Sequence, residues 1–212
     1  MWIDITMPLR NTMPVWPEDT PFTYKLDATY EQDGANVGQI QMSVHAGTHV
    51  DAPYHYDDFG KSVDALPVDL FIGDVYIIDA TSETYITVDF LRACSLPDCT
   101  RLFVKTKKAH HPFIFDEAFT AFSPEAIYFL AAHGIRLVGT DAPSVDAFGA
   151  PLVAHQACND TGITIIENLM LQACSTGFYD FIGLPLAIQG GDASPIRAVV
   201  QKKQQFVVTD NA

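Results

Sequence analysis

The chain has 212 residues, 48% of them hydrophobic and 18% charged, which is typical of a folded globular core. Its 12 basic and 26 acidic residues give a formal net charge of −14, which disfavours nucleic-acid binding. No apolar run reaches membrane-spanning length, and Asp4 stands where a signal peptide would carry basic residues. The four cysteines are scattered and form no C-x-x-C pair, so we expect reduced thiols in a cytoplasmic protein with no membrane partner.

Short runs rich in branched and aromatic residues predict most of the secondary structure as strands. In chain order they cover 2–5, 22–26, 37–44, 75–79, 101–106, 135–139, 163–166 and 181–188. Helices are predicted over 88–94, over 124–133 and in the segment leading into His155. Ser123 is the expected N-cap of the second helix, and Gly134 follows its end. With no repeat or linker to divide it, the chain predicts a single strand-rich α/β domain over residues 1–212.

The most informative segment is 45–55, which places His45, His49, Asp51 and His55 within eleven residues. Neutral imidazole and carboxylate together suit zinc or manganese. All four positions are odd-numbered, so in an extended chain the side chains point to one face. A helix would align the first two histidines but turn Asp51 aside, and Pro53 would break it. We therefore expect an extended or looped metal-binding segment.

Two further residues are candidates to complete this site. His155 is expected at the end of a helix, and Glu167 follows the apolar run 163–166, where a carboxylate would emerge from a buried strand. A strand-end acid that reaches solvent is the alternative for Glu167. The resulting six candidates exceed the three protein ligands of a usual catalytic zinc. Two metals, or one metal with a separate acid/base, would use them all. By contrast, the adjacent His110 and His111 diverge in any regular structure and are expected in a solvated loop.

The pattern His45-x-Gly47-Thr48-His49-x-Asp51-x-Pro53-x-His55 resembles the signature of the cyclase-like metal-dependent amidohydrolases. The resemblance extends over nearly the whole chain, with further matching stretches at 1–5, 15–21, 139–146, 167–169, 184–186 and 191–197. The most specific are Trp16-Pro17-Glu18-Asp19-Thr20-Pro21 and Gly191-Asp192-Ala193-Ser194-Pro195-Ile196-Arg197. One departure is Glu18, where the resemblance leads us to expect glycine.

The resemblance implies a swivelling β/β/α fold, two divalent metal ions per subunit and a homodimer or larger homo-oligomer. The metals would be zinc, with manganese or cobalt as alternatives. His45, His49 and Asp51 would hold one ion, Asp51 would bridge to the second, and His155 with Glu167 would complete that second site. His55 would act as acid/base, although it could instead be a ligand. Trp16 would line an aryl pocket for the small-molecule substrate; composition alone would place it in the core.

The activity that the resemblance implies is hydrolysis of N-formyl-L-kynurenine to L-kynurenine and formate. A hydroxide formed on the metal would attack the formyl carbon, and a protonated His55 would donate its proton to the leaving nitrogen. One alternative is hydrolysis of another aryl or cyclic amide, such as isatin. The other is a catalytically silent metal-binding module.

Overall fold

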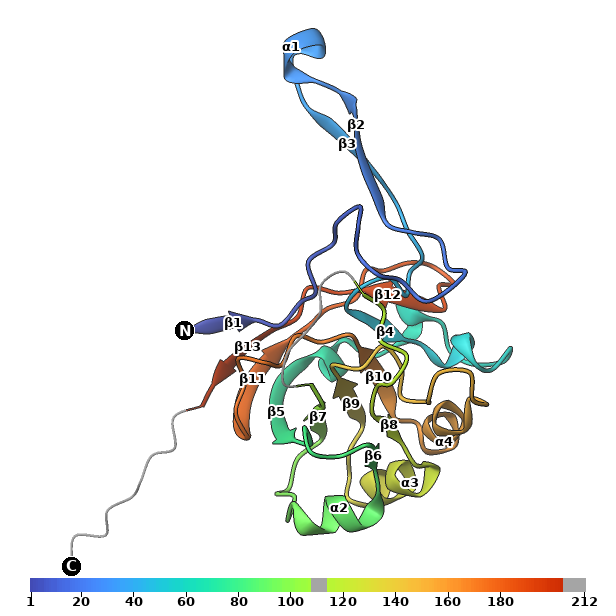
Figure 1. The fold of residues 1–212 in the computed structure, drawn as a ribbon, viewed down its shortest axis with the longest axis vertical. Coiled ribbons are helices and arrows are strands. Elements are labelled where there is room, and N and C mark those ends of the chain that lie inside the picture. Colours follow the sequence, from blue (N-terminus) through green and yellow to red (C-terminus); the bar gives the residue numbers. More distant parts are fainter. Residues whose placement is uncertain (108–113, 204–212) are drawn as a thin grey trace, which may run out of the picture.

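A mixed β-sheet organises the chain in the computed structural model, which describes residues 1–107 and 114–203. Nine strands of this part of the chain pair in the order β1-β13-β11-β5-β7-β9-β10-β4-β12. Their bounds, in that order, are Trp2–Asp4, Val199–Lys202, Gly177–Ile182, Ile72–Asp79, Arg101–Lys105, Leu137–Thr140, Thr164–Glu167, His49–Asp51 and Ala193–Pro195. Strands from both ends of the chain are therefore joined in one sheet (Figure 1).

The centre of the sheet is parallel. Strands β5, β7, β9 and β10 run in the same direction, whereas the strands outside them pair antiparallel. Every residue of β9 and β10 is buried, as expected for parallel strands that are covered on both faces. The carboxyl ends of the four parallel strands meet at one edge of the sheet, which is where ligand sites of α/β proteins form.

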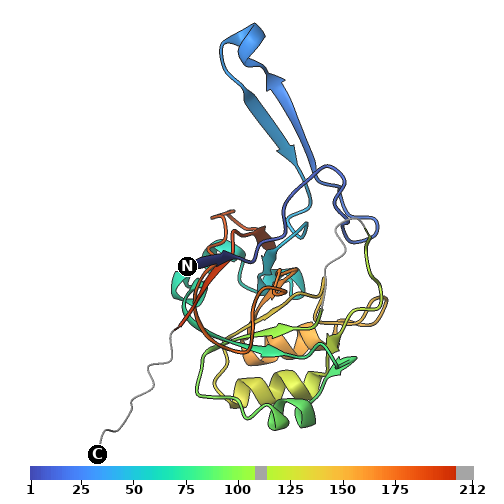
Figure 2. The same ribbon diagram turned by 60° about the vertical axis from the view of Figure 1, so that its left-hand side comes forward.

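One face of this sheet is covered by three helices, α2 (Val88–Ala93), α3 (Pro124–Ala132) and α4 (Val153–Thr161), which lie together in Figures 1 and 2. Ile127 and Leu130 of α3 are fully buried in the apolar cluster that includes Val138 and Ile165. On the other face a second cluster contains Phe103 and Phe181, whose ring centroids lie 4.9 Å apart. Two cores thus hold the sheet from both sides.

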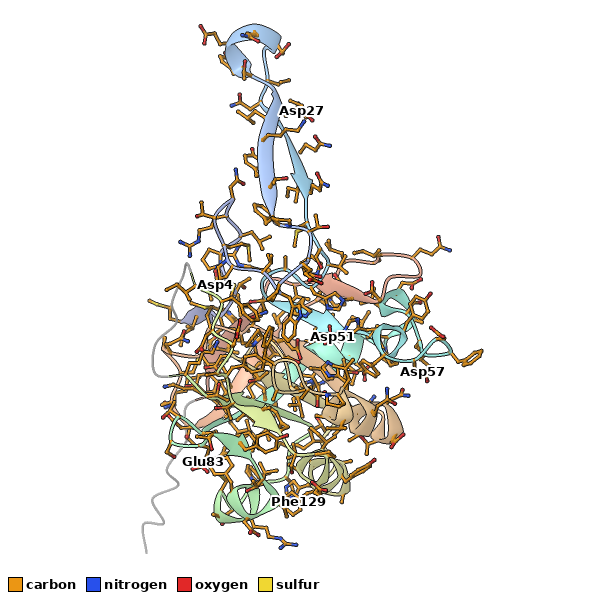
Figure 3. The ribbon with its side chains drawn as sticks, turned by 45° about the vertical axis from the view of Figure 1, so that its right-hand side comes forward. Asp4, Asp27, Asp51, Asp57, Glu83 and Phe129 are labelled. Carbon is orange, nitrogen blue, oxygen red and sulfur yellow. The ribbon has the colours of Figure 1, made fainter. Side chains whose placement is uncertain are left out.

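Smaller elements connect these layers. Strands β6 (Tyr85–Ile86) and β8 (Ala121–Phe122) pair with each other, and three 3₁₀ turns, η1 (Pro53–His55), η2 (Val63–Ala65) and η3 (Val68–Phe71), follow β4 along the chain. Strands β2 (Thr23–Ala28) and β3 (Val37–Gln41) form a hairpin with the short helix α1 (Tyr30–Asp33) at its tip. This hairpin stands away from the sheet, with Asp27 on it and Asp51 in the body (Figure 3).

The mixed α/β class with more strand than helix is confirmed. Helix α3 has the expected start, because Ser123 Oγ accepts a hydrogen bond from the Ala126 N–H at 3.1 Å. Three expectations need correction. Residues 183–188 form no strand, and the three-residue strands β4 and β12, together with β13, were not predicted. His155 lies in the first turn of α4 rather than at its end.

Two further observations bear on the sequence-based expectations. In the ranges described, no helix combines the length and apolar character that crossing a membrane requires. The pair His110 and His111 falls outside the described residues.

Candidate active site

The candidate site is built on β4, whose three residues are all buried. This strand pairs with β10 on one side and β12 on the other, and the register sets His49 directly opposite Glu167. Since alternate residues of a strand point to the same face, His49 and Asp51 project together. Gly47, just before the strand, has a φ of 74°, a conformation that favours glycine and makes the turn into β4.

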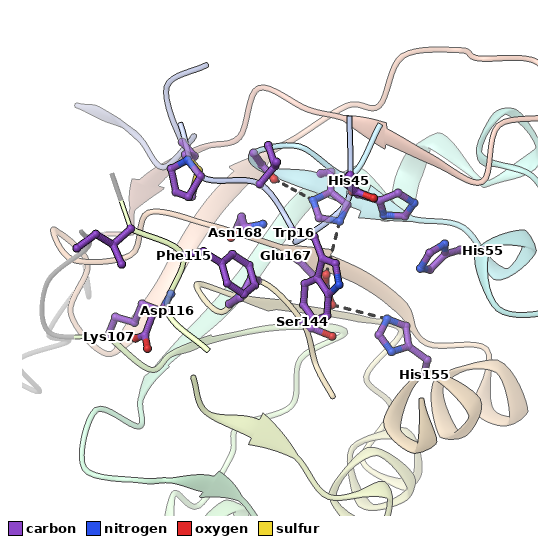
Figure 4. Close-up of a pocket in the computed structure, with 18 of the residues that line it drawn as sticks. Trp16, His45, His55, Lys107, Phe115, Asp116, Ser144, His155, Glu167 and Asn168 are labelled. Atoms are coloured by element: carbon purple, nitrogen blue, oxygen red, sulfur yellow. Dashed lines mark hydrogen bonds and ion pairs between the residues drawn. The ribbon is translucent and has the colours of Figure 1, made fainter. Parts of the chain in front are cut away.

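Asp51 lies at the centre of a cluster of imidazoles. Its Oδ1 is 3.0 Å from His45 Nδ1 and 3.3 Å from His49 Nε2, and its Oδ2 is 3.6 Å from His155 Nε2. Glu167, at the end of β10, has Oε2 3.5 Å from His49 Nε2 and Oε1 3.7 Å from His155 Nε2. The first turn of α4 and the ends of two strands thus bring together residues that are far apart in sequence (Figure 4).

The outer nitrogens of the two buried histidines fix which nitrogen faces the carboxylates. His49 Nδ1 donates to the Gly47 carbonyl oxygen at 2.8 Å, and His155 Nδ1 donates to Asp146 Oδ2 at 2.7 Å. Both acceptors lack a proton to give, so both Nδ1 atoms carry the hydrogen. A neutral ring then presents an unprotonated Nε2 to Asp51 and Glu167. This is the orientation in which histidine binds a metal ion.

The donor set fits a divalent cation. His49 Nε2 and both carboxylate oxygens of Asp51 are buried without a hydrogen-bond partner among the described residues, although imidazole nitrogens and carboxylate oxygens lie within 3.7 Å of one another. Buried polar atoms are normally paired, and this group of buried acceptors without hydrogen-bond partners has the chemistry to bind a divalent cation. Two triads have all ligand atoms within 4.8 Å: His45, Asp51 and His55, and His49, Asp51 and Glu167. Asp51 belongs to both.

The electrostatics of the cluster agree with this fit. Burial raises the pKa of Glu167, and the neighbouring Asp51 charge adds to this effect. Burial would likewise raise the pKa of Asp51, but the surrounding histidines outweigh it and hold the pKa well below its ordinary range. Although burial lowers the pKa of His49 and His155, the carboxylates raise both to about 10. The site therefore attracts positive charge, as protons or as metal ions.

His55 occupies the more open side of the cluster. It lies in η1, its ring centroid is 4.1 Å from that of His45, and its Nδ1 is 3.6 Å from Asp192 Oδ2. The same carboxylate oxygen accepts a hydrogen bond from His45 Nε2 at 2.9 Å. Burial and the nearby charges of His45 and His155 lower the pKa of His55, so its ring is neutral near pH 7. A half-exposed neutral imidazole can take up and release a proton.

A cavity of about 350 Å³ opens beside the cluster, and His45, His49, His55, His155 and Glu167 all contribute to its wall. Trp16 lines it as well. Phe115 also lines the cavity, and its ring centroid lies 5.4 Å from that of Trp16, so one side of the cavity is aromatic. Phe148 supports Trp16, with 5.2 Å between the two ring centroids. Glu18, two residues on, has a φ of 75°, which explains why glycine is the residue expected there.

All six histidine and acid residues singled out from the sequence thus lie in one cluster, and Trp16 lines the adjoining cavity. Sequence reasoning did not assign a site role to Asp146, Asp192 or Phe115. Asp146 and Asp192 lie in stretches that carry the family resemblance, and this resemblance was the only sequence signal for a role in the site. For Phe115 the sequence contained no such signal.

The sequence and the fold are similar to those of a known class of proteins. Residues 3–147 match the Cyclase family, described as "Putative cyclase", and the chain belongs to that family. The kynurenine formamidase of Bacillus cytotoxicus is 40% identical over 202 residues, which is 94% of this chain and 97% of that protein. The kynurenine formamidase of Geobacillus thermodenitrificans is 39% identical over 203 residues, covering 95% and 97%.

Solved structures resemble the chain over nearly its whole length. A potential metal-dependent hydrolase with cyclase activity has a TM-score of 0.84 and 28% identity, with 96% of this chain and 98% of that chain covered. Isatin hydrolase A from Labrenzia aggregata has a TM-score of 0.83 and 25% identity, with coverage of 96% and 94%.

Proposed function

We propose that the chain is a metal-dependent amidohydrolase that converts N-formyl-L-kynurenine to L-kynurenine and formate. The observation that carries the proposal is the cavity, in which an aromatic wall adjoins a buried histidine–carboxylate cluster with orphaned ligand atoms. An aryl formamide needs both parts: a surface for the ring and polar groups at the scissile bond. The kynurenine formamidase relatives supply the particular substrate.

The metal would be zinc, with two ions per subunit. His45, His49 and Asp51 would hold one ion, and His155 with Glu167 would hold the second, with Asp51 shared between them. Asp51 suits a shared ligand because its two oxygens face different histidines. When bound, such ions supply an activated water and polarise the amide carbonyl. Asp146 would keep the His155 ring in the ligating tautomer through its 2.7 Å hydrogen bond.

The aromatic wall would orient the substrate. Trp16 and Phe115 line the cavity, and Phe148 packs against Trp16; an aniline ring packed against the two lining rings would direct its formyl group toward the cluster. Holding the reacting carbon in place removes much of the entropic cost of the reaction.

His55 would move the proton that hydrolysis requires. The C–N bond of the formamide breaks, the oxygen of water is added to the formyl carbon, and the departing nitrogen must gain a proton. With its pKa lowered, His55 is neutral at the start and can accept a proton from water at Nε2, then deliver it to the nitrogen. Asp192 would orient the ring from the Nδ1 side.

The test is turnover of N-formyl-L-kynurenine by chelated protein to which zinc, manganese and cobalt are returned one at a time. We expect turnover to return with metal, and His55→Ala to lose about 100-fold or more in kcat while its metal content is unchanged. Absence of turnover with every metal would overturn the proposal.

Two other outcomes would identify the alternatives. Preference for isatin over formylkynurenine would make the chain a hydrolase of cyclic amides, the activity named for one structural neighbour. Metal binding with no hydrolysis of either compound would make it a silent metal-binding module.

We further propose that residues 1–212 act as one domain that forms a homodimer or larger homo-oligomer in the cytoplasm. All strand residues of the β2–β3 hairpin except Ala28 are exposed, and Tyr30, Val37 and Ile40 are 73%, 54% and 57% exposed. An isolated hairpin is marginal in water, so a second copy of the chain is the natural cover for these apolar side chains. The four free cysteines suit a reducing compartment.

A further inference from the structure

The cavity contains a cation that the proposed chemistry does not use. Lys107 follows β7, is half-buried and lines the cavity together with Asp116. Among the described lining residues it is the only lysine or arginine. In a chain with a net charge of −14, an anionic group of a ligand would meet repulsion almost everywhere else.

The backbone at Lys107 is fixed by a buried carboxylate. Asp141, directly after β9, accepts hydrogen bonds from the Thr106 N–H at 2.8 Å, the Thr106 hydroxyl at 2.6 Å and the Lys107 N–H at 3.1 Å. These bonds tie the carboxyl ends of two parallel strands together at the mouth of the site. Lys107 is therefore a positioned residue, in contrast to a lysine on a free surface loop.

Among the described residues, none forms an ion pair with the ammonium group of Lys107. Burial lowers its pKa, and the charges of Asp141 and Asp116 oppose this effect. Asp116 is exposed, and its Oδ1 accepts a hydrogen bond from the Ala118 N–H at 3.0 Å, which holds the carboxylate in its turn. The cavity thus offers one positive and one negative group near each other.

The groups that line the cavity can contact the separate parts of an aryl amino acid. In Figure 4 the rings of Phe115 and Trp16 lie between Lys107 and Asp116 on one side and the histidine cluster on the other. In N-formylkynurenine the formamide and the ketone side chain that carries the α-ammonium and α-carboxylate stand on adjacent ring carbons. With the ring against the aromatic wall and the formamide at the cluster, the flexible side chain can extend along the wall toward Lys107.

We propose that Lys107 and Asp116 form a subsite for the amino-acid end of the substrate. Lys107 binds the α-carboxylate, and Asp116 accepts hydrogen bonds from the α-ammonium. This inference rests on the proposed function, to which it adds a basis for selecting amino-acid substrates over simple aryl formamides. We expect both contacts to be equally strong in the ground state and the transition state, so that their loss raises KM and leaves kcat nearly unchanged.

The test compares two substrates of the metal-loaded protein. One is N-formyl-L-kynurenine; the other is 2-formamidoacetophenone, which keeps the aryl formamide and ketone but lacks the amino-acid end. We expect Lys107→Met to raise KM for formylkynurenine roughly 10- to 100-fold, the size of a lost charged contact, with kcat nearly unchanged. Turnover of 2-formamidoacetophenone should be unaffected. Lys61→Met, at an exposed lysine outside the cavity, is the matched control.

A second variant pair tests the acid. Asp116→Asn should raise KM for formylkynurenine about 3- to 10-fold, because its contact is more exposed to water. Glu117 is the next residue along the chain and does not line the cavity. Glu117→Gln should therefore leave KM for both substrates unchanged. Two results would overturn the subsite. If Lys107→Met lowered turnover of both substrates equally, the substitution would have damaged the cavity as a whole. If KM for formylkynurenine were unchanged, Lys107 would not bind the substrate.

Calorimetry with L-kynurenine and 2-aminoacetophenone separates failure of the subsite from failure of the proposed function. Kynurenine binding that is weakened by Lys107→Met, in a protein without formamidase turnover, would retain the subsite and reject the reaction. Turnover of formylkynurenine without a selective effect of Lys107→Met would retain the reaction and reject the subsite. If the wild-type protein neither binds kynurenine nor hydrolyses its formyl derivative, both are wrong.

Discussion

Asp146 illustrates how a residue that touches no substrate can control the site. It is buried, and it accepts hydrogen bonds from the Ala154 N–H at 2.8 Å, the His155 N–H at 3.1 Å and His155 Nδ1 at 2.7 Å. The first turn of α4 and the ring of a metal-ligand candidate are thus anchored to one carboxylate. The hydrogen bonds also lower the pKa of Asp146, although burial alone would raise it.

We expect Asp146→Asn to weaken zinc affinity about 10- to 100-fold, because the amide no longer stabilises the tautomer that places the lone pair on His155 Nε2. Competition with a chelating dye measures the affinity. Asp160→Asn is the control: this acid lies on the same helix, is exposed and accepts a hydrogen bond from Tyr128 at 2.7 Å. Equal zinc affinities for Asp146→Asn and wild type would show that Asp146 only caps the helix.

The residues of the site differ in how well their roles could be predicted from the sequence. His45, His49, Asp51 and His55 share one segment with regular spacing, so their chemistry could be predicted locally. Asp146 and Asp192 come from separate loops, and an acid in a loop normally faces solvent. Only the pairing of β4 with β10 and β12, together with the turn before α4, brings them to the histidines.

At the scale of elements, predictability followed local signals. Helix α3 has a capping serine, a proline at its first position and a terminal glycine, and its bounds were predicted closely. Helix α4 has a C-terminal glycine, Gly162 with a φ of 71°, but its N-cap is Leu152, which makes no capping hydrogen bond. The start of α4 therefore lacked a local signal, and His155 was placed at the wrong end. The segment that contains β4 was expected to be extended or looped, and this agrees with the structure. Neither β4 nor β12 was predicted as a strand, because three residues give too short a pattern and such strands depend on pairing.

The β2–β3 hairpin yields a prediction about assembly. Replacing Tyr30 with Ser and Ile40 with Lys removes apolar surface that a second copy would cover, so we expect the oligomer to dissociate to monomers while the circular dichroism spectrum is retained. Light scattering coupled to size-exclusion chromatography measures the mass. Phe59→Ser, at a 98% exposed residue outside the hairpin, should leave the mass unchanged. A wild-type monomer would contradict the proposed homo-oligomer.

At the scale of the whole molecule, the site links stability to pH and metal. In metal-free protein, burial lowers the pKa of His49 and His155, but the carboxylates outweigh it and raise both to about 10, above the ordinary value of 6.5: Asp51 and Glu167 act on His49, and Asp146, Asp51 and Glu167 act on His155. Protonation of these histidines therefore stabilises the folded state. This contribution is complete below about pH 6.5 and is lost as pH rises toward 10.

We expect the free energy of unfolding of the chelated protein to fall between pH 7 and pH 9, as measured by urea unfolding. In zinc-loaded protein the bound ions replace the protons, so the loaded protein should gain stability over the chelated protein as pH rises. If the difference in the free energy of unfolding between zinc-loaded and chelated protein became smaller from pH 7 to pH 9, the assignment of these histidines as ligands would be wrong.

The position of β4 between β10 and β12 also has a consequence for biosynthesis. The first half of the site is translated by residue 55, but its strand has no neighbours until residues 164–167 and 193–195 have left the ribosome. A nascent chain therefore carries an exposed histidine segment through most of its synthesis without a closed site. Metal can be captured in its final geometry only when the last strands of the sheet are in place.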